Sequence, residues 1–253
     1  MCRHIGYIGK KKNLNSILLN HSHSLIELAY KPKEMKNATL NADGFGIAWK
    51  NKNNFDVYKN NLPIWNDLNL KSISKSVYSN LVIGNVRSAT NSEYLGYYNT
   101  HPFNYNNYCF SHNGYIEGFN VLTKKKILKY LNEKFYRLLK GNTDSELIFI
   151  LLMQFIENSN NVTESIRAVI EIVENNFSAA MLNFLLAVNK GDKNYLFATK
   201  YSKFLKTPTL YYTQDKNQSF TISSEKLNSE KWYRIKNQSI VKVFKNSIIM
   251  KSL

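Results

Sequence analysis

The chain begins Met1-Cys2-Arg3, with a cysteine directly behind the initiator methionine. A second residue as small as cysteine usually leaves the methionine open to removal, which would give Cys2 a free α-amine beside its thiol. The thiol is nucleophilic as a thiolate, and an α-amine with a pKa of roughly 7.7–8.0 can accept its proton near neutral pH. We therefore expect Cys2 to act as a nucleophile that carries its own base.

Three further stretches hold groups that attack on an amide requires. Arg87 ends a predicted strand, and Asp144 stands at a predicted helix start. Asn113 and Gly114 follow another predicted strand, as a side-chain amide and then a backbone N–H that no side chain screens. The amide of Asn113 and the N–H of Gly114 can form an oxyanion hole, in which losing one donor typically costs on the order of 10²–10³ in rate.

Taken singly, these residues have ordinary explanations. A strand-end arginine is commonly a surface ion-pair partner, and an aspartate in a first helical turn commonly balances the helix dipole. Cys109, the other of two cysteines, lies in a predicted buried strand, where a free cysteine behaves as a small hydrophobe. Two cysteines give no disulfide framework, and the pair His21-x-His23 has no Cys or carboxylate cluster nearby. We therefore expect no metal site.

The pattern of apolar residues predicts the elements that must position these groups. Strands are predicted over residues 2–7, 44–49, 81–87 and 108–112. Helices are predicted over residues 14–29, 121–139, 143–156 and 163–174. In the third helix, Thr143 and Glu146 match a Thr-x-x-Glu capping box. Only strands are predicted after that, over residues 179–188, 195–199, 210–213, 220–223 and 240–244. This order indicates a layered α+β domain in which helices cover paired sheets.

Composition limits the class of protein. The 253 residues are 43% hydrophobic and 13% aromatic, which is enough for a sizeable core. The formal charge is +16, but the lysines are spread along the chain beside asparagines, so we expect a solvated basic surface rather than a nucleic-acid groove. Steering of anionic small substrates is an alternative use of that charge. No run approaches the roughly 18 apolar residues of a membrane span, and the N-terminus does not resemble a signal peptide. We expect a cytoplasmic protein that binds neither nucleic acid nor membrane.

Five motifs follow one another along the chain. They are Cys2, Arg87-x-Ala-Thr90, His101-Pro102-Phe103, His112-Asn113-Gly114 and Thr143-Asp144-x-Glu146. In this order they resemble the glutaminase domain of class II glutamine amidotransferases, which are N-terminal nucleophile hydrolases. The resemblance implies a four-layer α/β/β/α sandwich of the N-terminal nucleophile hydrolase type, formed by residues 2–253 as a single domain.

Carried over position by position, the resemblance implies Cys2 as nucleophile, with Asn113 and Gly114 as oxyanion hole. Arg87 would bind the α-carboxylate of a glutamine-like substrate and Asp144 its α-amino group. A guanidinium fork suits a carboxylate, and an aspartate suits an ammonium. The resemblance implies no cofactor.

The same resemblance places Thr90 close to this head group. Segments 1–6, 23–25, 41–49 and 223–227, followed by Trp232, are similar to the stand-alone branch of the family. That branch includes the amidohydrolase of ergothioneine biosynthesis, which removes glutamate from γ-glutamyl-hercynylcysteine S-oxide. No ammonia-using domain is expected in this length, so the simplest fate of an acyl-enzyme is transfer to water.

The resemblance therefore favours hydrolysis of a γ-glutamyl amide through a γ-glutamyl thioester on Cys2, with the ergothioneine intermediate as substrate. One alternative is a glutaminase subunit that delivers ammonia from glutamine to a partner synthase. Another is a γ-glutamyl peptide hydrolase of glutathione breakdown. A third is a γ-glutamyl-binding module without catalysis, which retention of Met1 would favour.

Overall fold

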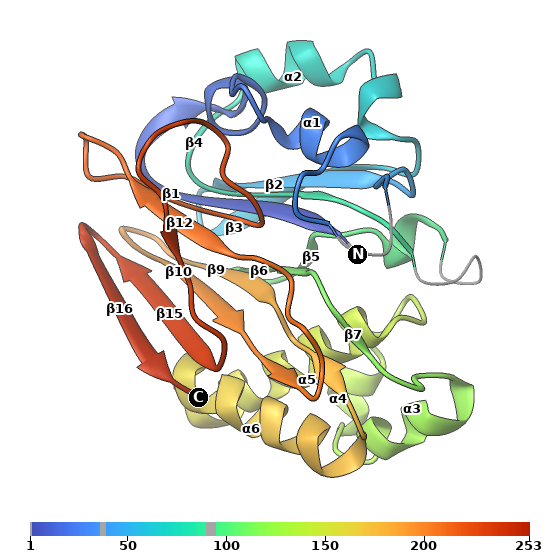
Figure 1. Cartoon of the computed structure of the whole chain (residues 1–253). Coiled ribbons are helices and arrows are strands. Elements are labelled where there is room, and N and C mark those ends of the chain that lie inside the picture. The colour runs from blue at the N-terminus through green and yellow to red at the C-terminus, as the bar shows by residue number, and fades with distance from the viewer. Residues whose placement is uncertain (1, 36–38, 90–94) are drawn as a thin grey trace.

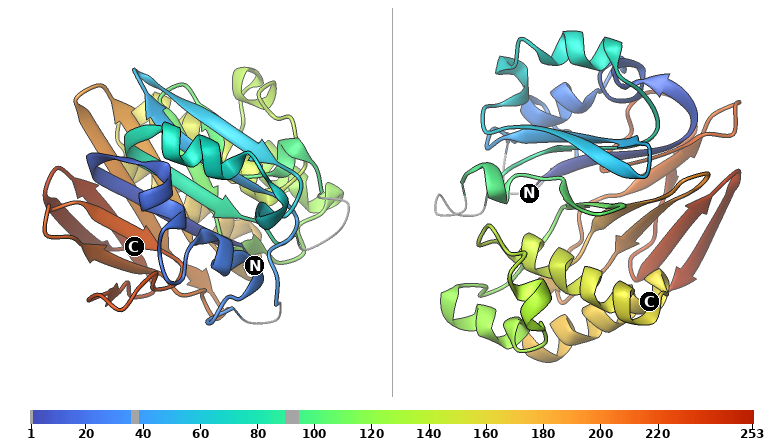
Figure 2. Two further views of the ribbon diagram at one scale, coloured as in Figure 1. Left: turned by 90° about the horizontal axis from the view of Figure 1, so that it is seen from above. Right: turned by 180° about the vertical axis from the view of Figure 1, so that it is seen from behind.

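Two β-sheets stack face to face, and helices cover both outer sides. The computed structural model describes residues 2–35, 39–89 and 95–253. Figure 1 shows α1 and α2 above one sheet and α3 to α6 below the other, and the view from behind in Figure 2 repeats this order. The predicted α+β, four-layer α/β/β/α sandwich is confirmed.

The upper sheet has seven strands and contains β1 near its centre. Its order is β14 (Tyr233–Arg234), β12 (Tyr211–Gln214), β13 (Phe220–Ser223), β1 (Arg3–Asn13), β4 (Tyr78–Val86), β2 (Phe45–Asn51) and β3 (Asn54–Asn60). All the pairings in this sheet are antiparallel. The strand that follows Cys2 is therefore held on both sides, by β4 and β13.

The lower sheet has six strands, and a small three-stranded sheet adjoins its helices. The six are β16 (Ser247–Ser252), β15 (Ser239–Phe244), β10 (Lys193–Lys200), β9 (Phe184–Lys190), β6 (Tyr108–His112) and β5 (Phe103–Tyr105). The small sheet is β11 (Ser202–Lys203), β8 (Ala180–Met181) and β7 (Tyr115–Ile116).

Helices and helical turns complete the outer layers. They are a π-helical turn (Asn15–Leu19), α1 (Leu25–Tyr30), 3₁₀ turns (Ile64–Asn66 and Tyr97–Asn99), α2 (Leu70–Ser76), α3 (Val121–Leu128), α4 (Glu133–Tyr136), α5 (Asp144–Ser159) and α6 (Val162–Asn176). Among the described residues, no helix is both long and apolar enough to cross a membrane.

Strand alternation divides the core into three apolar layers. On β1, Ile5 and Tyr7 pack against α1, whereas Ile8 faces the lower sheet. On β6, Cys109 faces the upper sheet and Phe110 packs beneath it among the α5 side chains. Cys109 is fully buried and burial raises its thiol pKa, which confirms the prediction of an inert core cysteine.

Two predicted helices are each divided by a polar cap. The helix predicted over residues 14–29 is a π-helical turn and then α1, because Ser24 and Glu27 form a capping box that starts a new helix. The helix predicted over residues 121–139 is α3 and then α4, because the Asn132 side chain accepts from the backbone N–H of Phe135. Strands β3 and β16 and helix α2 were not predicted.

The predicted start of α5 is confirmed at Thr143, whose hydroxyl accepts from the N–H of Glu146 at 3.2 Å. The reciprocal half of the predicted capping box is wrong. The Glu146 carboxylate instead accepts from the backbone N–H groups of Lys140 and Gly141, each at 2.8 Å. The donors to this carboxylate therefore come from the turn before the helix.

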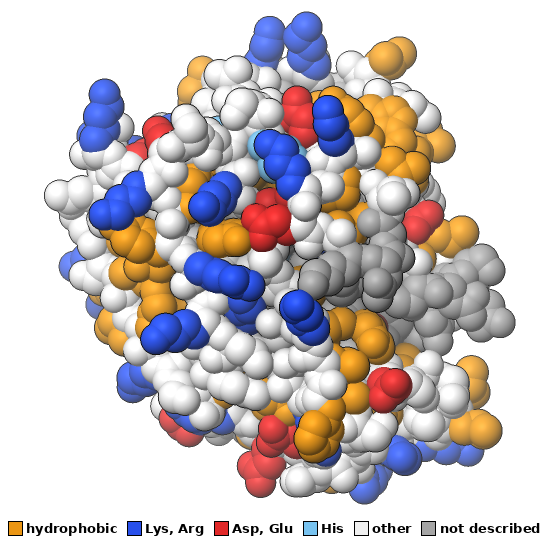
Figure 3. Space-filling model, viewed as in Figure 1, with side chains coloured by type: hydrophobic (Ala, Val, Ile, Leu, Met, Phe, Trp, Pro, Cys, Tyr) orange, Lys and Arg blue, Asp and Glu red, His pale blue; other side chains and the backbone are white. Residues whose placement is uncertain are grey.

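The basic residues do not form one stripe on the face shown in Figure 3. Lys and Arg side chains are scattered over it among polar and apolar ones. This distribution fits a solvated basic surface better than a phosphate-tracking groove.

Candidate active site

Cys2 and Arg87 lie at the same end of the upper sheet. The antiparallel register pairs Arg3 with Val86, so the next residues outward on β1 and β4 are Cys2 and Arg87. Only 8% of Cys2 is exposed, and its Sγ lies 3.8 Å from the backbone oxygen of Ser88. The sheet register therefore brings the predicted nucleophile to the predicted carboxylate-binding arginine.

Arg87 is buried among groups that can carry negative charge. Burial lowers the pKa of its guanidinium below the ordinary value, and the nearby Cys2 thiol and the Asp43 and Asp144 carboxylates oppose that shift. An arginine stays protonated in proteins, so the site holds a fixed positive charge. Cys2 and Asp144, which are far from Arg87 in sequence, therefore lie near enough to act on its charge.

Asp43 forms hydrogen bonds with the backbone of Arg87 and Ala89. The sequence alone did not indicate this role. The Asp43 N–H donates to the Arg87 carbonyl at 3.0 Å, and its Oδ2 accepts from the Ala89 N–H at 2.7 Å. Gly44 accepts from the Arg87 N–H at 2.9 Å and has φ of +105°, which favours glycine. The sequence Asp-Gly before a strand signals a turn, but nothing in it indicates which distant backbone the aspartate binds.

Asn113 is fully buried at the end of β6. Its backbone N–H donates to the carbonyl of Asn183 at 2.8 Å, which fixes the chain direction. Its side-chain Nδ2 lies 3.5 Å from the hydroxyl oxygen of Ser224, and its Oδ1 has no hydrogen-bond partner among the described residues. A buried amide with unused capacity can receive a further polar partner.

Gly114 occupies a position that no larger residue fits. A Cβ built there would lie 2.6 Å from His112 Nε2 and closer still to the carbonyl oxygen of Met181. Because neither neighbour can move freely, the absence of a side chain keeps this backbone in place next to Asn113. The geometry accounts for the Asn-Gly pair as a packed backbone turn.

Asp144 begins α5 and is oriented by its own helix and by β7. Its Oδ2 accepts from the N–H of Ile116 at 2.8 Å, and its Oδ1 accepts from the N–H and hydroxyl of Ser145 at 2.7 and 3.2 Å. A carboxylate offers about four lone-pair sites, so these three donors leave room for another. Asp144 is half-buried and can therefore receive a ligand ammonium.

Polar side chains lie between the two sheets beside this site. The hydroxyl of Ser111 on β6 contacts His4 Nδ1 at 3.3 Å and accepts from Asn85 Nδ2 at 3.0 Å. His112, next on β6, points to the opposite face and contacts the Ser145 hydroxyl at 2.9 Å. Burial, with the charges of His112 and Arg3, lowers the pKa of His4 to about 3. His4 is therefore neutral near pH 7.

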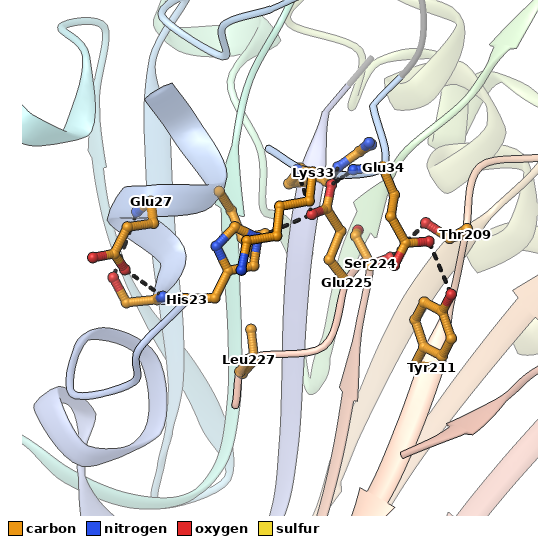
Figure 4. Close-up of polar contacts among 12 residues, drawn as sticks. His23, Glu27, Lys33, Glu34, Thr209, Tyr211, Ser224, Glu225 and Leu227 are labelled. Atoms are coloured by element: carbon orange, nitrogen blue, oxygen red, sulfur yellow. Dashed lines mark hydrogen bonds and ion pairs between the residues drawn. The ribbon is translucent and has the colours of Figure 1, made fainter. Parts of the chain in front are cut away.

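Ser224 and Glu225 directly follow β13 and form hydrogen bonds with residues at the start of β1. The Ser224 hydroxyl accepts from the N–H of His4 at 3.0 Å, and the Ser224 N–H donates to the His4 carbonyl at 3.0 Å. The Glu225 carboxylate accepts from Arg3 Nε at 2.8 Å. Figure 4 shows Glu225 between His23 and the Lys33–Glu34 segment. In the sequence, residues 223–227 contribute only to a resemblance, since their distance along the chain from Cys2 gives no signal of contact.

The other predicted positions have varied outcomes. Thr90 lies outside the residues that the structure describes. His101 is buried, and its pKa is lowered well below the ordinary value by burial and by the charge of Arg87. His23 lies just before α1 and contacts Glu225 Oε2 at 2.9 Å. Within the described ranges, no three His, Cys, Asp or Glu side chains gather as a metal-binding group.

Sequence comparisons find related proteins from yeast and bacteria. The chain is 31% identical over 166 residues to the probable glutamine amidotransferase DUG3 of Saccharomyces cerevisiae, covering 62% of this chain and 46% of that protein. It is 28% identical over 117 residues to the gamma-glutamyl-hercynylcysteine sulfoxide hydrolase of Mycobacterium tuberculosis, covering 46% of this chain and 50% of that protein. The chain thus spans about half the length of these curated relatives.

Solved structures share the fold. A glutamine aminotransferase class-II domain protein from Silicibacter pomeroyi superposes with a TM-score of 0.71 at 22% identity, covering 99% of both chains. The family model for class-II glutamine amidotransferases matches residues 19–231, which is most of the chain. With Cys2, Arg87 and Asp144 grouped at one end of such a fold, the chain belongs to the class II glutamine amidotransferases.

Proposed function

We propose that the protein hydrolyses a γ-glutamyl amide and releases glutamate. The observation that carries this proposal is the strand register that places Cys2 beside Arg87, with the Asp144 carboxylate near enough to act on the Arg87 charge. A cation and an anion near one nucleophile match the α-carboxylate and α-ammonium of a glutamyl head group. The matched family and the enzymes named among the relatives support the same reaction class.

The proposed reaction starts after removal of Met1. The α-amine of Cys2 takes the thiol proton while Sγ attacks the γ-carbonyl carbon. Asn113 Nδ2 and the Gly114 N–H donate to the resulting oxyanion. The α-ammonium then protonates the leaving nitrogen as the C–N bond breaks, which leaves a γ-glutamyl thioester on Cys2. Water attacks this thioester, the amine accepts its proton, and glutamate leaves with the thiol restored.

The leaving group is a finer proposal. A relative named gamma-glutamyl-hercynylcysteine sulfoxide hydrolase supports that sulfoxide as the donor, with release of glutamate in ergothioneine biosynthesis. A relative named probable glutamine amidotransferase supports glutamine as the other candidate donor. We propose residues 2–253 as one catalytic domain that needs no cofactor.

The test is glutamate release from three donors assayed in parallel: glutamine, glutathione and γ-glutamyl-hercynylcysteine S-oxide. Cys2→Ala is expected to abolish release from every donor, whereas Cys109→Ala, which alters the other cysteine, is expected to retain it. Hydroxylamine should trap a γ-glutamyl hydroxamate with the wild-type protein, since it intercepts a thioester. Wild-type turnover by Cys2→Ala, or intact Met1 in the active protein, would overturn the proposal.

A further inference from the structure

Arg3 links the nucleophile to a buried carboxylate far along the chain. Its side chain is fully buried, its Nη1 donates to the carbonyl oxygen of Cys2 at 3.0 Å, and its Nε donates to Glu225 Oε1 at 2.8 Å. One planar guanidinium therefore bonds to the backbone of Cys2 and to Glu225 at the same time. Only arginine offers several donors in such a rigid fork.

The position of Cys2 explains why such a link matters. An interior residue is held by a peptide bond on each side, but a residue that becomes the first of its chain keeps only one. Its carbonyl is then the nearest backbone group by which the rest of the protein can fix it. Catalytic groups held about 1 Å out of place can lose about 10²-fold in rate.

Glu225 is built as a rigid anchor for this arginine. Its two oxygens also accept from His23 Nε2 at 2.9 Å and from the backbone N–H groups of Lys33 and Glu34 at 2.8 and 3.0 Å. Burial alone would raise its pKa, but the His23 hydrogen bond and the Arg3 charge lower it to about 2. The carboxylate is therefore charged at neutral pH and fixed by donors from three segments.

The Lys33–Glu34 segment is itself held from the other side. The hydroxyl of Tyr211 on β12 donates to Glu34 Oε2 at 2.8 Å, as Figure 4 shows. Glu225 therefore cannot shift without disturbing β1, the residues before α1 and this segment together. The position of Glu225 is therefore fixed by the upper sheet and the segments that flank it.

A gain in stability does not by itself explain why Arg3 and Glu225 form a buried ion pair. Replacing a buried ion pair by apolar residues is often neutral or stabilising, because desolvating two charges is costly. A second ion pair on β1, from Lys12 Nζ to Asp215 Oδ2 at 2.8 Å, is partly exposed and lies at the opposite end of the strand from Cys2. It joins the same strand to the β12–β13 connection but does not touch Cys2.

We infer that Arg3 and Glu225 are positioning residues that hold the backbone of the N-terminal nucleophile in its reactive place. The inference rests on the proposed function, since it concerns how Cys2 acts. Neither residue contacts the substrate in this role. Loss of the pair should therefore lower kcat and leave KM nearly unchanged.

The decisive variant is Arg3→Met combined with Glu225→Gln, which removes both charges and so leaves no uncompensated buried ion. Arg3→Lys is the second variant, because it keeps a charge for Glu225 but not the fork. Asp215→Asn is the matched control, because it removes the charge that pairs with Lys12 at the other end of β1. The measurements are kcat and KM for glutamate release, the urea midpoint of unfolding, and the rate of Cys2 alkylation by iodoacetamide, read by mass spectrometry with Cys109 as internal reference.

We expect kcat to fall about 10²-fold in the double variant and in Arg3→Lys, with KM within about twofold and a changed alkylation rate at Cys2. Asp215→Asn should keep the wild-type kcat. Wild-type kcat in a folded double variant or in Arg3→Lys would overturn the inference. So would a kcat loss that follows the urea midpoint equally in all variants, Asp215→Asn included. Full activity of Cys2→Ala would instead overturn the proposed function, so the two failures are distinguishable.

Discussion

The contacts of individual residues determine which groups can bind at the candidate site. A side chain at position 114 would clash, because the Met181 carbonyl and the His112 ring already fill the space that the Cβ of a larger residue than Gly114 would need. Asp144 takes three donors from its surroundings and keeps capacity for one more. These are local constraints of packing and of lone pairs, and each can be tested by one substitution.

Gly114→Ala should reduce catalysis strongly. The added methyl must displace backbone beside Asn113, which moves the proposed oxyanion donors. We expect kcat for glutamate release to fall on the order of 10²–10³. Steady-state kinetics measures the effect, with far-UV circular dichroism to verify the fold. A folded variant with wild-type kcat would argue against Gly114 as a donor.

For individual residues, the sequence predicted which side chains lie near one another but not which contacts fix their positions. Cys2, Arg87 and Asp144 could be named from motif order and chemical type, and the structure brings them together. Asp43 and Glu225 were not assigned roles, because their contacts come from strand register across the fold. A spacing of 222 residues between Arg3 and Glu225 carries no local signal.

Element boundaries place the reactive groups. β1 and β4 run antiparallel, so the start of one and the end of the other coincide, and this alone puts Cys2 by Arg87. The helix α5 begins at Asp144, which sets that carboxylate at an N-terminus where its charge is favoured. Site geometry therefore depends on where strands and helices begin and end.

Thr143→Ala should destabilise the protein by about 0.5–2 kcal/mol, since it removes the N-cap of α5. Thr143→Ser keeps a hydroxyl and should retain most of that stability. Urea unfolding monitored by circular dichroism measures both. Because Asp144 follows the cap directly, the alanine variant should also raise KM for a γ-glutamyl donor. Equal stability of the two variants would exclude a capping contribution.

Most elements near the site were predictable, since they are short apolar runs that end at Gly or Asn. Two of the missed elements have a common cause. Strand β16 is largely exposed, and α2 is short and rich in Ser and Lys, so neither shows a strong apolar period. The division of two predicted helices was set by side-chain caps at Ser24 and Asn132, which compete with continuous apolar periodicity.

At the scale of the whole molecule, the space between the sheets is mostly apolar but becomes polar at the end near Cys2. Ile8, Leu81 and Leu185 pack in the apolar part, whereas His4 and Ser111 meet at the end near Cys2. Burial lowers the pKa values of His4, His101 and His112. These imidazoles therefore bind protons less readily in the folded protein than in the unfolded chain.

Stability should consequently fall in mild acid. A histidine whose folded pKa lies below its unfolded value of about 6.5 contributes stability that is present above that pH and is lost as the pH drops towards the folded pKa. His4, whose folded pKa is about 3, should cost about 1.4 kcal/mol per pH unit below pH 6.5. Urea unfolding from pH 7.5 to 5 measures the slope, and His4→Gln should flatten it by one proton. A slope that His4→Gln leaves unchanged would contradict a neutral His4.

The link from Arg3 to Glu225 also orders events in time. Translation makes Arg3 222 residues before Glu225, so the start of β1 and then β13 are synthesised before this carboxylate. A nascent chain would thus carry an exposed thiol and amine without the frame that directs them. We therefore expect Cys2 to gain its ordered position only after Glu225 has been synthesised and has paired with Arg3.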